Sequence, residues 1–188
     1  MRVIAGQYKS RPLRALPGAR TRPTSDRLRE TLFNVLTAGN PDALAGSRWL
    51  DLFAGTGAVG IEALSRGAAH VTFVDSAKAA ARVIRENLKS LGITEGFAIV
   101  ENDVTRALRD PALSAMEVRY VFVDPPYAEH QQYADTLRAL GESQILSADA
   151  VVIVEHDKRF DPGDEFERLQ RSRTLGQGDS RLSFYRLT

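Results

Sequence analysis

The 188-residue chain is 43% hydrophobic and 26% charged, which is ordinary for a globular protein and allows one well-packed domain. It has no cysteine, so disulfides, thiolate nucleophiles and cysteine-based zinc sites are excluded, and its three histidines are too scattered to hold a metal ion. No apolar run reaches the roughly 18 residues of a membrane span, and residues 1–14 lack the apolar core of a signal peptide. We therefore expect a cytoplasmic, monomeric enzyme or binding module, without a metal and without membrane association.

The formal net charge is +1, but the basic residues are concentrated near the amino terminus. Residues 1–30 hold eight basic and only two acidic side chains, which leaves the other 158 residues with a net negative charge. A basic segment on an acidic body favours a polyanion bound at one end, although a solvated tail would show the same composition. We predict a basic, nucleic-acid-facing arm at residues 1–24, as a hairpin, ahead of a main domain at 25–188. The candidate nucleic-acid-binding residues are Arg2, Lys9, Arg11, Arg14, Arg22 and Arg27.

Strand and helix patterns alternate along the main domain. Apolar runs predict buried strands at 47–53, 70–75, 97–103, 120–127 and 150–156, followed by a closing pair at 166–172 and 180–187. Helical spacing predicts helices at 22–38, 58–66, 76–92, near 104–110 and around 130–140. Such alternation through short loops indicates a Rossmann-like α/β fold, with a twisted, mostly parallel sheet covered on both faces.

An acidic residue stands at the end of every predicted parallel strand. These residues are Asp51, Asp75, Asp103, Asp124 and Glu155. Ligands of open α/β sheets bind beyond the carboxyl ends of the strands, so these side chains are candidates for a binding site.

The stretch `LDLFAGTGAVG`, residues 50–60, contains G-x-G-x-x-G at Gly55, Gly57 and Gly60. In dinucleotide-binding proteins the pyrophosphate lies over this loop, where Asp51 would repel it, and this disfavours a nicotinamide enzyme. An acid there suits the ammonium and sulfonium groups of S-adenosylmethionine, whose product after methyl transfer is S-adenosylhomocysteine. We therefore predict S-adenosylmethionine as the cofactor.

The predicted cofactor site assigns a contact to each strand end. Gly55 and Gly57 would let the backbone approach the methionine half and the ribose. Asp75 would bind the ribose hydroxyls, and Asp103 would accept a hydrogen bond from the adenine amine. The remaining candidate cofactor-binding residues are Phe53, Thr56, Val104 and Thr24.

The predicted catalytic residues are Asp124, Pro125, Pro126 and Tyr127, which follow an apolar strand directly. The two prolines fix the backbone and carry no N–H, so the Asp124 side chain and the Pro125 carbonyl can act as paired acceptors for an exocyclic amine. Holding both amine hydrogens directs the nitrogen lone pair at the sulfonium methyl, so most of the catalysis would be positioning. Tyr127 offers a face on which the target base can stack.

With `RVIAG` and `TRPTSDRLRETLFN` at the amino terminus, `DLFAGTGAVGIEALSRGA` and `DPPY` resemble the RsmD-type methyltransferases, which methylate guanine N2 in 16S rRNA. The resemblance covers residues 1–156. It implies a seven-stranded class I methyltransferase sheet, an activity of the 16S rRNA (guanine(966)-N(2))-methyltransferase type, and a substrate presented in the assembled small ribosomal subunit.

By the same resemblance Asp51, Gly55 and Gly57 belong to the family's loop and 124–127 to its catalytic tetrapeptide. Arg22, Thr24 and Arg27 would border either the methyl donor's carboxylate or an RNA phosphate. Two departures stand out: Asp75 replaces a common glutamate, and Gln177 replaces a tyrosine near the carboxyl terminus.

Two other functions fit the residues less well. D-P-P-Y also suits adenine N6 or cytosine N4, but a DNA enzyme usually needs a further domain to recognise its site. A non-catalytic RNA- or cofactor-binding module would not need the intact tetrapeptide. His156, a lone histidine after Glu155, is interpreted as structural.

Overall fold

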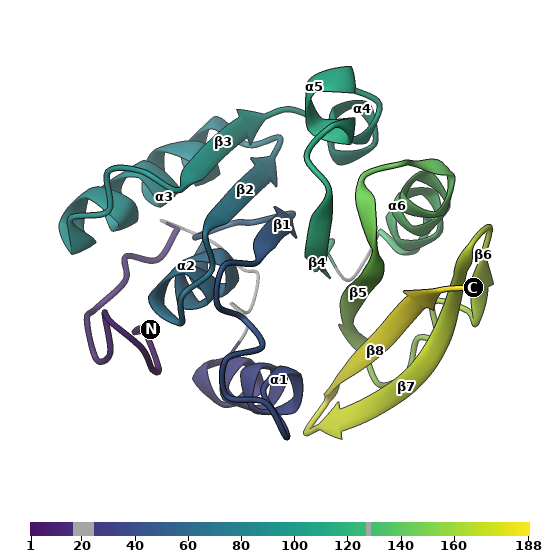
Figure 1. Ribbon diagram of the computed structural model, residues 1–188, viewed down its shortest axis with the longest axis horizontal. Coiled ribbons are helices and arrows are strands. Elements are labelled where there is room, and N and C mark those ends of the chain that lie inside the picture. The colour runs from purple at the N-terminus through teal and green to yellow at the C-terminus, as the bar shows by residue number, and fades with distance from the viewer. Residues whose placement is uncertain (17–24, 127–128) are drawn as a thin grey trace.

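The computed structural model describes residues 1–16, 25–126 and 129–188, and within them the strands form one eight-stranded sheet (Figure 1). The strand order is β3-β2-β1-β4-β5-β8-β7-β6. The parallel strands are β1 (Arg48–Leu52), β2 (His70–Asp75), β3 (Phe97–Glu101), β4 (Val118–Val123) and β5 (Leu146–Asp157). The antiparallel strands are β6 (Glu165–Phe166), β7 (Leu169–Gln177) and β8 (Ser180–Leu187).

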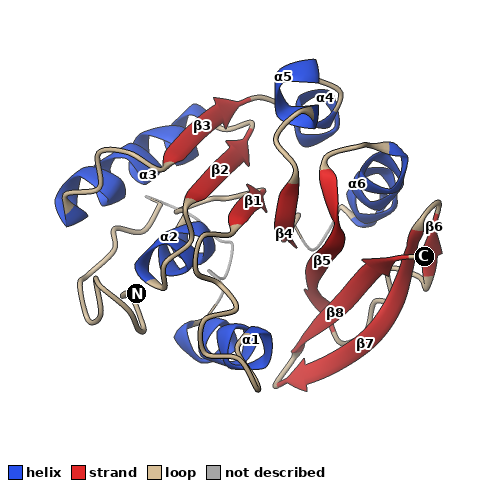
Figure 2. Cartoon of the chain, viewed as in Figure 1, coloured by secondary structure: helices blue, strands red, loops and turns tan. Residues whose placement is uncertain are grey.

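Helices cover both faces of the sheet (Figure 2). One face is packed by α1 (Asp26–Leu36), α2 (Ala58–Ser65) and α3 (Lys78–Leu91). The other face is packed by α4 (Val104–Leu108), α5 (Pro111–Ser114) and α6 (His130–Glu142). Within the described residues, no helix combines the length and apolar character that a membrane crossing requires.

The predicted α/β class is confirmed, but the bounds of several elements differ from the prediction. The strand predicted at 120–127 is β4, which ends at Val123 ahead of two prolines that have no N–H for a ladder. The strands predicted at 97–103 and 166–172 are observed at Phe97–Glu101 and Leu169–Gln177, since Asp103 caps α4 and β7 pairs along β8.

The helix predicted at 22–38 begins at Asp26, because the Ser25 hydroxyl accepts the Leu28 N–H as an N-cap. The single helix predicted near 104–110 is two helices, since Asp110 caps a new one that starts at Pro111. Strand β5 begins at Leu146, four residues before the predicted start. The seven strands of the predicted sheet become eight through the two-residue β6, which pairs with β7 at the edge.

Residues 1–13 fold back on themselves, with the Val3 N–H donating to the Arg11 carbonyl at 3.0 Å and the Ser10 N–H to the Val3 carbonyl at 2.9 Å. Val3 and Leu13 are buried in the core that α1 and α2 share. This basic arm, residues 1–16 in the structure, is therefore packed against the sheet's helical layer and shares its core.

A buried carboxylate on α2 fastens the arm. Glu62 is fully buried, and its two oxygens accept the N–H groups of Ile4 at 2.7 Å and Ala5 at 2.9 Å. Arg66 pairs with the same carboxylate at 2.7 Å, and the buried Arg29 of α1 approaches it at 3.9 Å. Glu62 therefore joins the arm and α1 to the helix that follows the glycine loop.

Candidate active site

The carboxyl ends of the central strands lie at one edge of the sheet. In the parallel register Val123 of β4 is opposite Leu52 of β1 and Val154 of β5. Asp124 follows β4 directly. Glu155, predicted to end its strand, instead lies within β5, which continues to Asp157 because Glu155, His156 and Asp157 pair with β8. This edge therefore brings the start of the D-P-P-Y motif beside the loop that follows β1.

The glycine loop depends on backbone conformations that side chains disfavour. Gly55 and Gly57 have φ angles of 54° and 75°, and Phe53 adopts φ 58° although it carries a large side chain. A Cβ at Gly60 would lie 2.4 Å from the Phe73 ring, so this third glycine permits close packing of α2 on the sheet. Strained backbone at a non-glycine residue is typical of functional loops.

Asp51 lies beneath this loop and is 2% exposed. Its Oδ2 accepts the Gly60 N–H at 2.9 Å, which ties β1 to the first turn of α2. Burial raises the pKa of Asp51 to about 7, against the lowering effect of the Gly60 hydrogen bond, and the nearby Asp75 raises it further. Such a carboxyl group is stabilised in its charged form by any cation bound close to it.

Asp75 and Asp103 both bond to nearby backbone. Asp75 is half-buried, and its oxygens accept the N–H groups of Gly55 at 2.9 Å and Ala77 at 2.8 Å. Asp103 is exposed and caps α4, and the hydrogen bond from the Thr105 hydroxyl is the main cause that lowers its pKa. Each carboxylate oxygen has two lone pairs, so both residues keep acceptor capacity for a ligand.

Two further predicted cofactor-binding residues, Val104 and Thr56, are buried. Val104 and Thr56 are 3% and 9% exposed. The Thr56 carbonyl accepts a hydrogen bond from the Asn87 side chain of α3 at 3.0 Å, and the same side chain accepts the Arg14 N–H at 2.7 Å. Asn87 therefore connects the glycine loop to the basic arm.

Helix α6 contacts the described part of the tetrapeptide, residues 124–126, through a hydrogen bond to its backbone. Pro125 is buried, Pro126 is exposed and Asp124 is half-buried. The hydroxyl of the buried Tyr133 donates to the Pro125 carbonyl at 3.4 Å. Tyr127, Arg22 and Thr24 lie outside the described residues.

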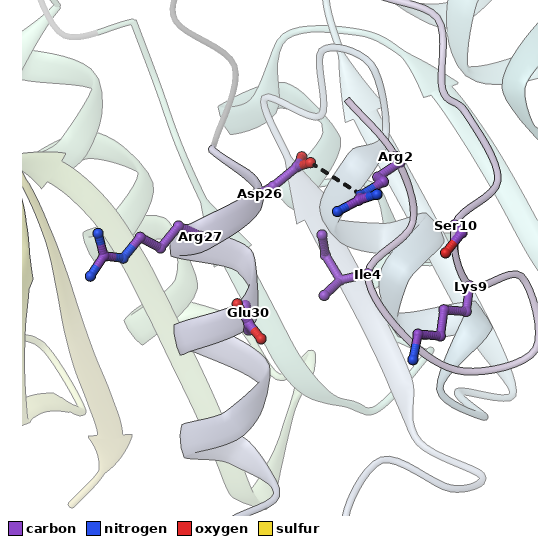
Figure 3. Close-up of a pocket in the computed structure, with 7 residues that line it drawn as sticks. All are labelled: Arg2, Ile4, Lys9, Ser10, Asp26, Arg27 and Glu30. Atoms are coloured by element: carbon purple, nitrogen blue, oxygen red, sulfur yellow. Dashed lines mark ion pairs between the residues drawn. The ribbon is translucent and has the colours of Figure 1, made fainter.

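The predicted nucleic-acid-binding residues fall into two groups. Arg2, Lys9 and Arg27 line a surface groove of about 550 Å³ between the arm and α1 (Figure 3). The other residues that line it are Ile4, Ser10, Asp26 and Glu30. Arg2 pairs with Asp26 at 4.0 Å, and Arg27 projects away from the arm in the same view.

Arg11 and Arg14 lie against α3 and form the second group. Arg11 donates to the Ser90 carbonyl at 2.8 Å, and Arg14 pairs with Glu86 at 3.0 Å. The predicted single binding surface is therefore divided between two sides of the arm.

His156 is buried, with Nδ1 2.8 Å from the Phe160 carbonyl and Nε2 2.9 Å from the Ser183 hydroxyl. Burial lowers the pKa of this imidazole. Both ring nitrogens are engaged, which agrees with the structural interpretation.

Four polar side chains of the site were not singled out from the sequence: Arg29, Glu62, Asn87 and Tyr133. The available signal was their position, since each occupies the apolar face of a helix. Among the described residues, no group of three or more His, Cys, Asp or Glu side chains is arranged to hold a metal ion.

Comparison with known proteins identifies the family. A family model described as “Conserved hypothetical protein 95” matches residues 1–186. A Bacillus subtilis (strain 168) protein, “Putative rRNA methyltransferase YlbH”, is 38% identical over 186 residues, covering 99% of this chain and 98% of its own length. The chain belongs to the RsmD family. The resemblance predicted from its motifs is thus confirmed.

Further relatives agree with this family. “Ribosomal RNA small subunit methyltransferase D” of Escherichia coli (strain K12) is 37% identical over 157 residues, which is 84% of this chain and 75% of the relative. The solved structure “Putative methyltransferase yhhF from Escherichia coli” has a TM-score of 0.82 and 30% identity, over 100% of this chain and 97% of the other. These neighbours confirm the predicted class I methyltransferase fold.

Asp51 should make the protein less stable as the pH rises. Its folded-state pKa is about 7 against an ordinary value of 3.8, so the stability it contributes is present below pH 4 and is lost as the pH rises through 7. Urea unfolding of wild type and Asp51→Asn should show wild type losing about 2–3 kcal/mol relative to the variant between pH 5 and 8. Asp135→Asn, an exposed carboxylate on α6, is the matched control. Parallel pH curves for wild type and Asp51→Asn would contradict the assignment.

Proposed function

We propose that this protein transfers a methyl group from S-adenosylmethionine to the exocyclic N2 amine of a guanine in 16S rRNA, within an assembled small ribosomal subunit. The observation that carries the proposal is the placement of Asp124 and Pro125 directly beside the glycine loop, at the carboxyl edge of the sheet. Family membership supports the substrate, since one relative is named an rRNA methyltransferase and another a small subunit rRNA methyltransferase.

The residues at the glycine loop fit the methyl donor. A Cβ placed on Gly55 would meet only the Phe53 carbonyl, at 3.9 Å, so the space beside this glycine is open to a ligand. Asp51 would attract the donor's ammonium and sulfonium charges, and binding of a cation would favour the ionised carboxylate. Asp75 would bind the ribose hydroxyls and Asp103 the adenine amine. S-adenosylmethionine supplies an already activated methyl group, so no metal is needed for the transfer.

Asp124 and the Pro125 carbonyl would hold the target amine. Each accepts one amine hydrogen, and together they orient the nitrogen lone pair towards the donor. Because the prolines fix the backbone, these acceptors are already in position before the substrate binds. Tyr133 would use one lone pair of the Pro125 carbonyl and leave the other for the amine. Tyr127 would stack on the extracted base, which offsets part of the cost of unstacking it.

Asp124→Ala should abolish methyl transfer while the methyl donor still binds. The alanine removes the acceptor for one amine hydrogen but leaves the glycine loop unchanged. Transfer of labelled methyl groups to small subunits should fall by more than about 100-fold, and calorimetry should show donor affinity within about twofold of wild type. Asp135→Ala on α6 removes an exposed carboxylate that is not part of the tetrapeptide or the glycine loop, and should leave both measurements unchanged. Retained turnover in Asp124→Ala would show that the tetrapeptide is not the catalytic centre.

Tyr133→Phe should slow transfer without weakening substrate or donor binding. It removes one hydrogen bond to the Pro125 carbonyl, worth about 1 kcal/mol, so kcat should fall roughly fivefold with KM unchanged. Tyr120→Phe is the matched control, because Tyr120 is also buried and its hydroxyl bonds to the Ala43 carbonyl, at 3.1 Å. An equal loss of kcat in the two variants would indicate a general packing effect.

A further inference from the structure

The exposed face of α3 carries a row of four basic side chains: Lys78, Arg82, Arg85 and Lys89. At 100° per residue these positions fall within an arc of about 60°, and the row extends over about 16 Å of the helix. All four side chains are exposed. Among the described residues, none of the four takes part in an ion pair. We call these four residues the α3 row.

The one carboxylate of α3 is engaged by the arm. Glu86 pairs with Arg14 at 3.0 Å, and one turn further on Arg11 donates to the Ser90 carbonyl at 2.8 Å. These contacts lay the arm along the flank of the α3 row. Arg14 neutralises Glu86, so α3 has no unpaired carboxylate beside the row, and Arg11 adds a further cation on its flank.

In the part of the chain that the structure describes, α1 and α6 do not show such a row of like charges. The exposed face of α1 alternates signs through Asp26, Arg27 and Glu30, and on α6 Asp135 pairs with Arg138 at 3.8 Å. Like charges three or four residues apart on a helix repel each other and destabilise it. Each neighbouring pair in the α3 row has this repulsion. A bound polyanion would replace the repulsion with attraction between its negative charges and the row.

The position of the α3 row relates it to the active site. Because α3 follows β2, its amino-terminal end lies at the carboxyl edge of the sheet (Figure 1). Only Ser76 and Ala77 separate Asp75, the last residue of β2, from Lys78. Lys78 is therefore the member of the row nearest to that edge, and Lys89 is the farthest from it. The basic surface leads away from the site along the same face of the sheet as the arm.

We propose that the α3 row, with Arg11 and Arg14, is a second RNA-docking surface that binds the phosphodiester backbone of the rRNA flanking the methylated nucleotide. The proposal rests on the proposed function for its RNA substrate. A straight row of cations without aromatic or large apolar anchors fits a line of phosphates, whereas a protein interface is centred on such anchors. The surface supplies affinity and orientation for the RNA and carries no base recognition.

The salt dependence of RNA binding tests this surface directly. Arg82→Gln/Arg85→Gln removes two charges at exposed helix positions, and glutamine keeps the helix propensity. For protein-free 16S RNA the slope of log K against log salt should become shallower by about 1.4–1.8, with a roughly tenfold loss of affinity at low salt. Arg82→Lys/Arg85→Lys keeps the charges and should retain the wild-type slope.

The control is Arg109→Gln/Arg138→Gln, which removes two exposed arginines, one at the C-cap of α4 and one on α6, on the other face of the sheet. The proposal would be overturned if the salt-dependence slope of Arg82→Gln/Arg85→Gln equalled the slopes of this control and of wild type. Weaker binding to small subunits with an unchanged slope on protein-free RNA would also overturn it, because the row would then contact a ribosomal protein. Methyl transfer by wild type is measured in parallel. If the variant shows the shallower slope but wild type transfers no methyl group, the proposed reaction is rejected and the RNA-docking surface is retained.

Discussion

The buried carboxylate of Glu62 is the contact on which the arrangement of the amino-terminal half depends. It accepts two backbone N–H groups of the arm and pairs with Arg66, while Arg29 reaches both this carboxylate and the Arg2 carbonyl. Detaching the arm would remove two hydrogen-bond donors from a buried carboxylate and leave only its arginine partners, which is unfavourable for a buried charge. The arm is therefore held beside the helix that begins at the glycine loop. The groove at α1, and the position of Arg11 and Arg14 beside the α3 row, depend on this placement.

Two features of the glycine loop, where the proposed donor site lies, lower the stability of the fold. Phe53 occupies a left-handed backbone conformation, and Asp51 is buried at a pKa of about 7. Both features oppose folding, and neither is needed to build a parallel sheet. A bound cationic donor would reduce the unfavourable effect of burying Asp51, because it would stabilise the ionised carboxylate. The tight contact of Gly60 with Phe73 keeps α2 close to the sheet, so the loop has little freedom to relax.

The sequence predicted the strands, the main helices and the edge at which the acids gather, because these follow from hydrophobic period and strand ends. Helix boundaries depended on caps, as at Ser25 and Asp110, which compete with longer apolar patterns. The roles of Glu62 and Asn87 were not predictable from the sequence. Glu62 binds the arm and Asn87 binds both the arm and the glycine loop, and these segments are far from them in the sequence. The division of the arginines between two surfaces was not predictable for the same reason, because contacts with distant segments determine it. Arg14 is placed by Glu86 and Asn87 of α3, and sequence proximity to Arg2 and Lys9 did not reveal this.

The proposed reaction methylates a guanine amine of the small ribosomal subunit at one site on the carboxyl edge of the sheet. The most direct measurement supplies wild-type protein and labelled S-adenosylmethionine with unmodified small subunits, protein-free 16S RNA and DNA in parallel, and identifies the labelled nucleoside. We expect N2-methylguanine on the small subunits and no label on DNA. Label on DNA as N6-methyladenine, or no transfer to any of the three, would contradict the account.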